Sequence, residues 1–321
     1  MALDLSGLTA YVEEKTDGIL STALLSPRFT DYVTTWEGVK SSIALPNLES
    51  TVPFQSGASC NAVTTSGTTT ISQTTLATTP IEFTEKICLQ DLEPYFTQKY
   101  LPNGATPDTA QIMSNIIERK MAQVALQLEQ AFFQGKTTYT NANQLKHFNG
   151  LISLVDTAGT AVAATSSTYN LTNARTIVEE IIFQKIPSSI LDQNPVVAMG
   201  MDNFRILLQK LWVDNLYHFV PNGNETKSYE LIYPGTNVKV VGLAGLNSDT
   251  SVDTGALPTA VKNRILAFSK QNVNYGVDLS SDSTSTDVWY EKKDRAIYIY
   301  GRFRAGVVGR FYTEMVQYTN S

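Results

Sequence analysis

Charge is scarce in this sequence. Charged residues make up 17% of its 321 residues, against roughly 25% in an average soluble protein. The formal net charge is −6, whereas a dedicated nucleic-acid-binding protein usually carries a basic patch or stripe. The composition therefore argues against that class, although it leaves room for a protein that only encloses nucleic acid.

Long hydrophobic runs are also missing. No stretch of about 18 apolar residues occurs, and a membrane-spanning helix needs about that length. The first residues, MALDLSGLTAYVEEKTDG, include acidic residues where a secretory signal would have basic ones. We therefore expect a protein that is made and kept in a cytosol, with no membrane partner. Cys60 and Cys88 are expected to be free thiols, because cytosolic proteins rarely keep disulfides.

Motifs of catalysis and metal binding are absent as well. The only histidines are His147 and His218, and neither belongs to a metal-ligand spacing. The sequence contains no C-x-x-C pair, no glycine-rich phosphate loop and no G-x-S-x-G nucleophile turn. We predict no catalytic residues, no metal ligands and no cofactor, so the chain is not expected to be an enzyme.

What is present begins with a long uncharged stretch. From Ser41 to Glu85 there is no lysine or arginine, and threonine and serine dominate. Threonine favours strands, which predicts a β-hairpin or extended arm over residues 41–90. A disordered Ser/Thr linker is the alternative, but the stretch holds too many apolar residues for a linker. An exposed strand edge is usually protected by charges, so we expect this arm to bind another subunit, through Phe54, Ile71, Leu76, Ile81 and Phe83.

A long amphipathic helix follows. Thr106 is the predicted N-cap, Pro107 the first helical residue, and Gly135 a left-handed residue just beyond the C-terminus at Gln134. Spacing at 3.6 residues per turn predicts one buried stripe, which consists of Met113, Ile117, Met121, Val124, Leu128 and Phe132. The opposite face is polar but nearly uncharged, and it consists of Arg119, Gln123, Gln127, Gln130 and Gln134. That face suits contact with an enclosed polyanion, and an ordinary solvated face is the alternative.

Residues 149–270 have the pattern of an α/β unit, and residues 271–321 the pattern of long strands. In AIYIYGRFRA, the residues Ile297, Ile299 and Phe303 share one face, while Arg302 and Arg304 share the other. We predict that the two arginines form salt bridges with a neighbouring subunit. Acidic groups of the same chain are an alternative partner, and solvated side chains are another.

The order of these parts resembles the major capsid protein of tailed bacteriophages, which has the Hong Kong 97-type fold that encapsulin shells share. The local matches are LQLEQAFFQGK followed by HFNGLIS, PVVAMGMDNFRILLQKL, and DVWYEKKDRAIYIYGRFRAGVV. The resemblance implies an α+β fold with five segments: an N-terminal arm (1–40), an E-loop hairpin (41–90), a P-domain part with the spine helix (91–148), an A-domain (149–270) and the closing P-domain strands (271–321).

The resemblance also implies a function. Such proteins assemble as hexamers and pentamers into an icosahedral shell around double-stranded DNA, without sequence specificity, with the help of a scaffold protein and a portal and sometimes with decoration proteins. Assembly would take place in the host cytoplasm. Residues 41–85 of the predicted E-loop contain no lysine that could form the covalent crosslink known in some members. An encapsulin-like cargo shell, another structural protein of a virion and an enzyme are the alternatives.

Overall fold

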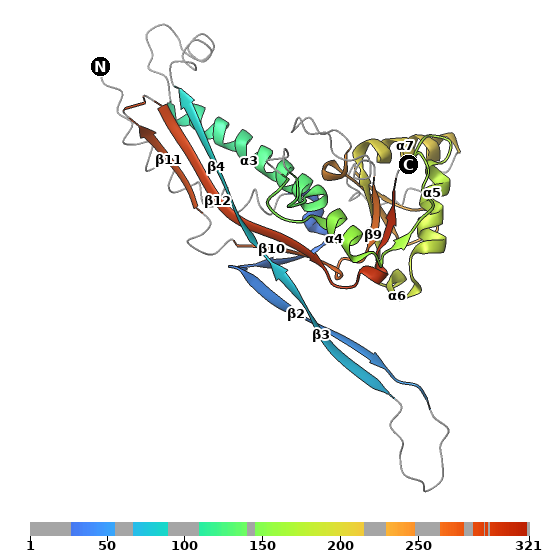
Figure 1. Ribbon diagram of the computed structural model, residues 1–321. Coiled ribbons are helices and arrows are strands. Elements are labelled where there is room, and N and C mark those ends of the chain that lie inside the picture. The colour runs from blue at the N-terminus through green and yellow to red at the C-terminus, as the bar shows by residue number, and fades with distance from the viewer. Residues whose placement is uncertain are drawn as a thin grey trace.

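The computed structural model describes residues 27–54, 67–88, 109–139, 145–214, 229–247, 264–278, 285–291, 293–294 and 296–319. Figure 1 shows its layout, in which a body built on two β-sheets carries a two-stranded hairpin that projects away from it. The architecture is mixed α and β, in agreement with the sequence.

The first sheet is organised around β12 (Ala296–Gly309). One edge of β12 pairs antiparallel with β4 (Thr79–Cys88). The other edge pairs with β11 (Ser285–Glu291) and further on with β10 (Val273–Val277), and β1 (Thr34–Glu37) adds to β10 in parallel. β12 therefore joins segments that lie more than 200 residues apart in the chain.

The side chains of β12 alternate between two environments, as the sequence predicts. Ile297, Ile299 and Phe303 are buried, whereas Arg302 is exposed and Tyr300 half-exposed. Successive side chains of a strand point to opposite faces, so one face of this sheet is apolar and requires cover.

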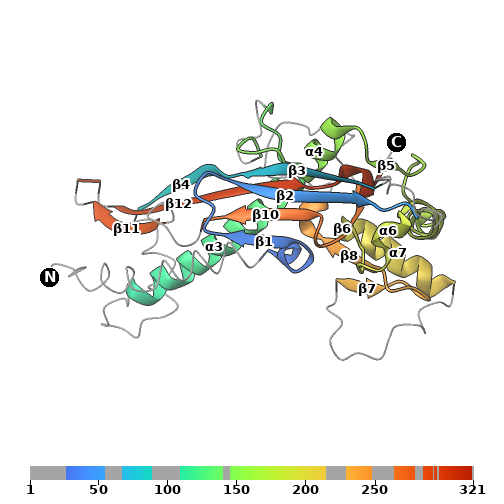
Figure 2. The same cartoon turned by 90° about the horizontal axis from the view of Figure 1, so that it is seen from below.

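That cover is α3 (Thr109–Gln134), which runs along the sheet (Figure 2). Its buried residues belong to the same core as the apolar face of β12, and Val124 is partly buried at the border of that core. The buried members of the predicted stripe are Ile117, Met121, Leu128 and Phe132. Thr106, Pro107 and the side chain of Met113 lie outside the described residues.

Gly135 follows α3 for a different reason than predicted. It is not among the described glycines with positive φ, so it is not a left-handed cap. A Cβ atom at this position would lie 2.6 Å from the carbonyl oxygen of Phe148. The N–H of Gly150 donates to the carbonyl oxygen of Gly135 at 2.8 Å. Glycine is needed because two backbone segments approach each other closely here.

The second sheet has six strands in the order β5-β13-β9-β6-β8-β7. Its central strand β6 is buried along its whole length, as expected for a short apolar run between helices. The strands are β5 (Val162–Ala163), β6 (Val196–Gly200), β7 (Glu230–Ile232), β8 (Lys239–Leu243), β9 (Ile265–Phe268) and β13 (Val316–Tyr318).

Short helices surround this second sheet. Several of them bury a second, mainly aliphatic core against it, which is distinct from the core that α3 covers. The helical segments of the body are η1 (Arg28–Tyr32), α4 (Leu151–Ala158), α5 (Ala174–Glu180) continued by the π-turn η2 (Ile181–Lys185), α6 (Ser188–Leu191), α7 (Met201–Val213), η4 (Ala244–Leu246) and η6 (Tyr312–Glu314).

The projecting hairpin consists of β2 (Ser42–Thr51) and β3 (Thr68–Ala77). It is shorter than the predicted range of 41–90, because residues 79–88 leave it and become β4 of the first sheet. Two further strands also lie outside their predicted segments. β1, from the predicted N-terminal arm, belongs to the first sheet, and β13, from the predicted closing strands, belongs to the second. In each case backbone pairing with a distant strand decides the placement.

Substitution of Gly306 on β12 tests how closely β12 packs against the base of the hairpin. A Cβ atom there would clash with the carbonyl oxygen of Ala77 at the end of β3. Gly306→Ala should lower the free energy of unfolding by about 1–3 kcal/mol, because backbone has to shift. Urea denaturation of the unassembled subunit, followed by circular dichroism, measures this. Ala122→Ser, at an exposed position of α3, is the control and should change stability by less than about 0.5 kcal/mol. Equal effects of the two substitutions would contradict the close packing.

Candidate functional site

The base of the hairpin is held firmly against the first sheet. Leu45 and Leu76 are buried and form a small cluster with Val308 of β12. Thr78 links β3 to β4, and its N–H donates to the carbonyl oxygen of Ser41 at 2.8 Å. The hydroxyl of Thr78 lies 2.9 Å from the carbonyl oxygen of Val39. These contacts give the hairpin a fixed direction relative to the body.

Leu76 therefore corrects the predicted set of subunit contacts. Its side chain is fully buried within its own chain, so it is not available to a neighbour. The reason is its register, because it lies one residue from the end of β3, where the hairpin rests on β12.

The outer half of the hairpin is exposed on both faces. Leu48 and Ile71 are 67% and 75% exposed, and they lie directly opposite each other in the strand register. Val52 and Phe54 farther out are exposed too. Burying a large apolar side chain contributes about 1.5–3 kcal/mol, so this is a considerable apolar surface for a thin ribbon to leave uncovered.

Hydroxyl and amide groups hold the two strands together along their length. The hydroxyls of Thr51 and Thr68 are 2.9 Å apart, and the amide of Asn47 donates to the hydroxyl of Thr74 at 2.7 Å. Among the described strands, β2 and β3 pair only with each other. A two-stranded ribbon of this kind is at best marginally stable alone, so both of its outer edges and its apolar pair are suited to contact with another molecule.

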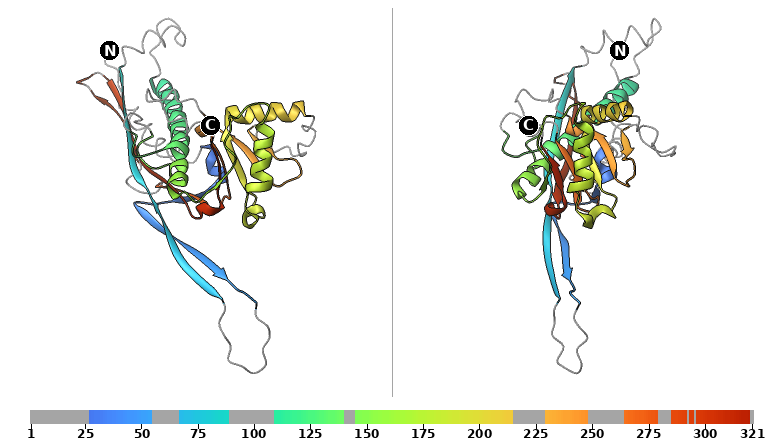
Figure 3. Two further views of the ribbon diagram at one scale, coloured as in Figure 1. Left: turned by 45° about the vertical axis from the view of Figure 1, so that its right-hand side comes forward. Right: turned by 90° about the vertical axis from the view of Figure 1, so that its right-hand side faces the viewer.

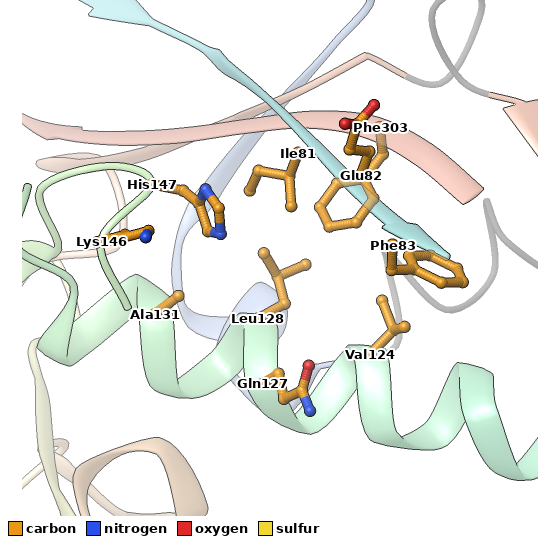
Figure 4. A pocket seen from close by; sticks show the side chains of 10 residues that line it. All are labelled: Ile81, Glu82, Phe83, Val124, Gln127, Leu128, Ala131, Lys146, His147 and Phe303. Carbon is orange, nitrogen blue, oxygen red and sulfur yellow. The ribbon is translucent and has the colours of Figure 1, made fainter. Parts of the chain in front are cut away.

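Ile81 and Phe83, which were predicted to contact a neighbour, point toward α3 from β4 (Figure 4). They are partly buried against the core and line a cavity of about 460 Å³ between β4 and α3. The other lining residues are Glu82, Val124, Gln127, Leu128, Ala131, Lys146, His147 and Phe303.

The polar face of α3 is only partly what the sequence predicts. Arg119 and Gln123 are exposed, and Gln127 and Gln130 are half-buried. Gln134 is buried, and its amide donates to the carbonyl oxygen of Gly245 at 2.5 Å. It cannot contact an enclosed genome, because η4 lies over the last turn of the helix.

Glu129 is a buried residue that the sequence analysis did not single out. Its carboxylate accepts hydrogen bonds from the N–H of Gly245 at 2.9 Å and from the N–H of Arg28 at 3.2 Å. Burial raises the pKa of this carboxyl above its ordinary value, although the two N–H groups act in the opposite direction. Glu129 thereby ties α3 to η1 and to η4. No local sequence signal marks it, because both partners are backbone groups about 100 residues away.

The two arginines of β12 differ in their surroundings. Arg304 donates to the carbonyl oxygen of Thr78 at 3.2 Å, so it supports the base of the hairpin in its own chain. Arg302 is exposed and lies opposite Glu82 of β4 in the register. The salt bridge of Arg302 with a neighbouring subunit stays a prediction.

No protein-family model matches the sequence, and no curated protein matches it either. Solved structures do match over nearly the whole length. A chain of the satellite phage P4 procapsid, which was solved with its size determination protein, superposes with a TM-score of 0.54 and 12% identity, over 95% of this chain and 98% of that one. A capsid chain of an empty GTA particle has a TM-score of 0.54 and 12% identity, over 94% and 90% of the two chains. A chain of the capsid of Myoviridae phage XM1 has a TM-score of 0.53 and 12% identity, over 90% of each of the two chains.

This chain has a phage capsid fold. Because the match covers 95% of this chain and 98% of the procapsid chain, it concerns the architecture as a whole and not one common motif. At 12% identity, the proteins share the fold. The individual side chains described above belong to this chain and are not inferred for the matched proteins.

Within the described ranges, no group of three or more His, Cys, Asp or Glu side chains lies close enough to hold a metal ion. No helix in those ranges is long and apolar enough to cross a membrane.

The carboxyl of Glu129 predicts a pH dependence of stability. Because its pKa is raised in the folded state, the folded protein keeps this proton at pH values where the unfolded chain has lost it. Its contribution to the free energy of unfolding is complete below the ordinary glutamate pKa and declines as the pH rises through the folded-state pKa. Wild type should therefore lose stability relative to Glu129→Gln as the pH rises above about 4.3, by about 1.4 kcal/mol per unit of pKa difference.

Urea denaturation of unassembled wild type and of the Glu129→Gln variant over a pH series measures this difference in the free energy of unfolding. Glu118→Gln is the matched control, because Glu118 is exposed on the same helix, and it should track wild type. A difference between wild type and Glu129→Gln that stays constant or grows in favour of wild type as the pH rises would refute the prediction.

Proposed function

We propose that this chain is a major capsid protein, a structural subunit that assembles into hexamers and pentamers of an icosahedral shell enclosing double-stranded DNA. The observation that carries the proposal is the hairpin, whose outer half holds four large apolar side chains away from its own body. Figure 3 shows the hairpin extending from the body in both views. The capsid fold of the solved structures supports the same function.

The geometry of such a contact suits a closed shell. The hairpin is one surface and its receiving surface on a neighbour must be another, so the contact is heterologous. Heterologous contacts form rings when the rotation closes, and hexamers and pentamers are rings of this kind. Stable assemblies bury roughly 2,000–5,000 Å² per interface, and a hairpin with ten paired residues on each strand supplies much of such an area without enlarging the body.

The same proposal assigns the segments of the chain. α3 corresponds to the spine helix, β2 and β3 to the E-loop, the first sheet to the P-domain and the second sheet with its helices to the A-domain. The residues before β1 correspond to the N-terminal arm, of which residues 1–26 lie outside the described residues. This role requires no catalysis, since burial and geometry suffice for it.

The interior partner would be DNA without sequence specificity. The face of α3 with Arg119, Gln123 and Gln130 is polar and nearly uncharged, which allows contact with DNA without strong binding. A scaffold protein, a portal and decoration proteins follow from the resemblance to tailed phages, as does assembly in the host cytoplasm.

Placing charges on the hairpin tests the proposal. Leu48→Asp combined with Ile71→Asp should abolish particle formation, because two desolvated carboxylates would oppose burial in the interface. The unassembled subunit should keep the thermal midpoint of its body, since both positions are exposed on the hairpin and lie outside the buried clusters. Sedimentation and negative-stain microscopy measure assembly, with the scaffold protein present.

Thr160→Asp is the matched control, because Thr160 is an exposed residue of the body. It should assemble as wild type does. If the variant with Leu48→Asp and Ile71→Asp forms particles at the wild-type yield, the proposal is wrong. Nuclease-resistant DNA inside the particles would distinguish a viral shell from an encapsulin-like shell, which would contain a cargo protein.

A further inference from the structure

We propose that Leu48 and Ile71 of one copy insert into the cavity between β4 and α3 of a neighbouring copy. This inference rests on the proposed function, in which copies assemble through the hairpin. It adds the receiving surface, which lies on this same chain.

The cavity has the chemistry and the size for two aliphatic side chains. It measures about 460 Å³, within the range of about 300–1,000 Å³ that is usual for ligand pockets. Its floor is formed by Leu128, Ala131 and Phe303, which are buried, whereas Ile81 and Val124 at its walls are only half-buried. Protein interiors are normally filled to crystal-like density, so apolar walls that face each other across such a space are suited to an apolar guest.

Phe83 is positioned in a way that leaves the cavity open. A Cβ atom at Gly301 would clash with the Phe83 ring, so that ring lies directly against the backbone of β12. Glycine at 301 lets the ring rest there instead of across the space between β4 and α3. Figure 4 shows Val124 and Leu128 pointing from α3 toward this space.

The hairpin cannot reach the cavity of its own chain. β3 passes into β4 through Thr78 alone, and the two strands run on in one general direction (Figure 1). Ile71 and Ile81 are ten residues apart along this extended chain, which corresponds to about 33 Å at 3.3 Å per residue. The contacts of Leu45, Leu76 and Val308 prevent the hairpin from folding back. Only a second copy can bring the apolar pair to the cavity.

Charge is compatible with this contact. The described hairpin residues include one charged side chain, Glu49, and no basic one. Lys146 and His147 lie along one side of the cavity (Figure 4). A ribbon with one carboxylate and no cation approaches that side without like-charge repulsion. Glu82, the acidic lining residue, accepts a hydrogen bond from the hydroxyl of Tyr300 at 3.2 Å on the other face of the sheet.

Disulfide trapping between copies tests the inference. The parent carries Cys60→Ser and Cys88→Ser, and assembled particles of the parent are required first. Copies with Ile71→Cys are then co-assembled with copies that carry Gln127→Cys at the cavity mouth. A disulfide requires Cα atoms within about 7 Å. We expect a covalent dimer on oxidation, at least ten times more abundant than with the control pair, Ile71→Cys and Arg302→Cys, which places the second cysteine on the opposite face of the sheet.

The outcomes separate the two proposals. A parent that forms no particles overturns the proposed function and this inference with it. If particles form but the control pair, Ile71→Cys with Arg302→Cys, crosslinks, the cavity is not the receiving surface. The same follows if neither pair crosslinks. In both cases the proposed function still stands. As a second measurement, Val124→Phe narrows the cavity and should raise the protein concentration needed for assembly at least tenfold. An unchanged assembly threshold with Val124→Phe would also overturn the inference.

Discussion

The structure depends on the junction at Thr78, where β3 passes into β4. On one side of this residue the ribbon pairs with β12 and becomes part of a sheet covered by α3. On the other side it leaves the sheet as a two-stranded hairpin. The cluster of Leu45, Leu76 and Val308 fixes the angle between the two parts. Because that angle is fixed, the apolar side chains farther out are held where their own core cannot bury them.

α3 is the element that unites the body. Its apolar stripe packs on the first sheet, and its last turns contact η4, which follows β8 of the second sheet. Glu129 and Gln134 make this second contact through backbone groups of Gly245 and its neighbours. Burying a carboxylate costs free energy, and two backbone N–H groups compensate only in part. This polar connection gives one sheet a defined position relative to the other. It also makes stability depend on pH, because the buried carboxyl of Glu129 has a raised pKa.

The apolar surface of the hairpin and the cavity beneath β4 complement each other within one sequence. A single copy leaves the apolar pair of its hairpin exposed and the cavity unfilled, and the proposed association of copies would bury the first in the second. Association of this type is heterologous and extends from copy to copy. In the proposed shell, the angle at which each copy holds its hairpin would decide whether rings close, and the packing around Thr78 sets that angle.

The sequence by itself determined the elements with a strong period. The stripe of α3, the two faces of β12 and the buried strand β6 follow from apolar spacing, and the stretch without lysine and arginine pointed to an arm with a partner. The sequence could not decide which part of that arm is covered, because apolar residues recur throughout it, as at Ile71, Leu76 and Ile81, without a change in composition. Only the tertiary structure decides this, since β12 pairs with residues 79–88 and no farther. The burial of Gln134 and Glu129, and the close approach that requires Gly135, likewise arise from backbone brought near from distant parts of the chain, which no local pattern encodes.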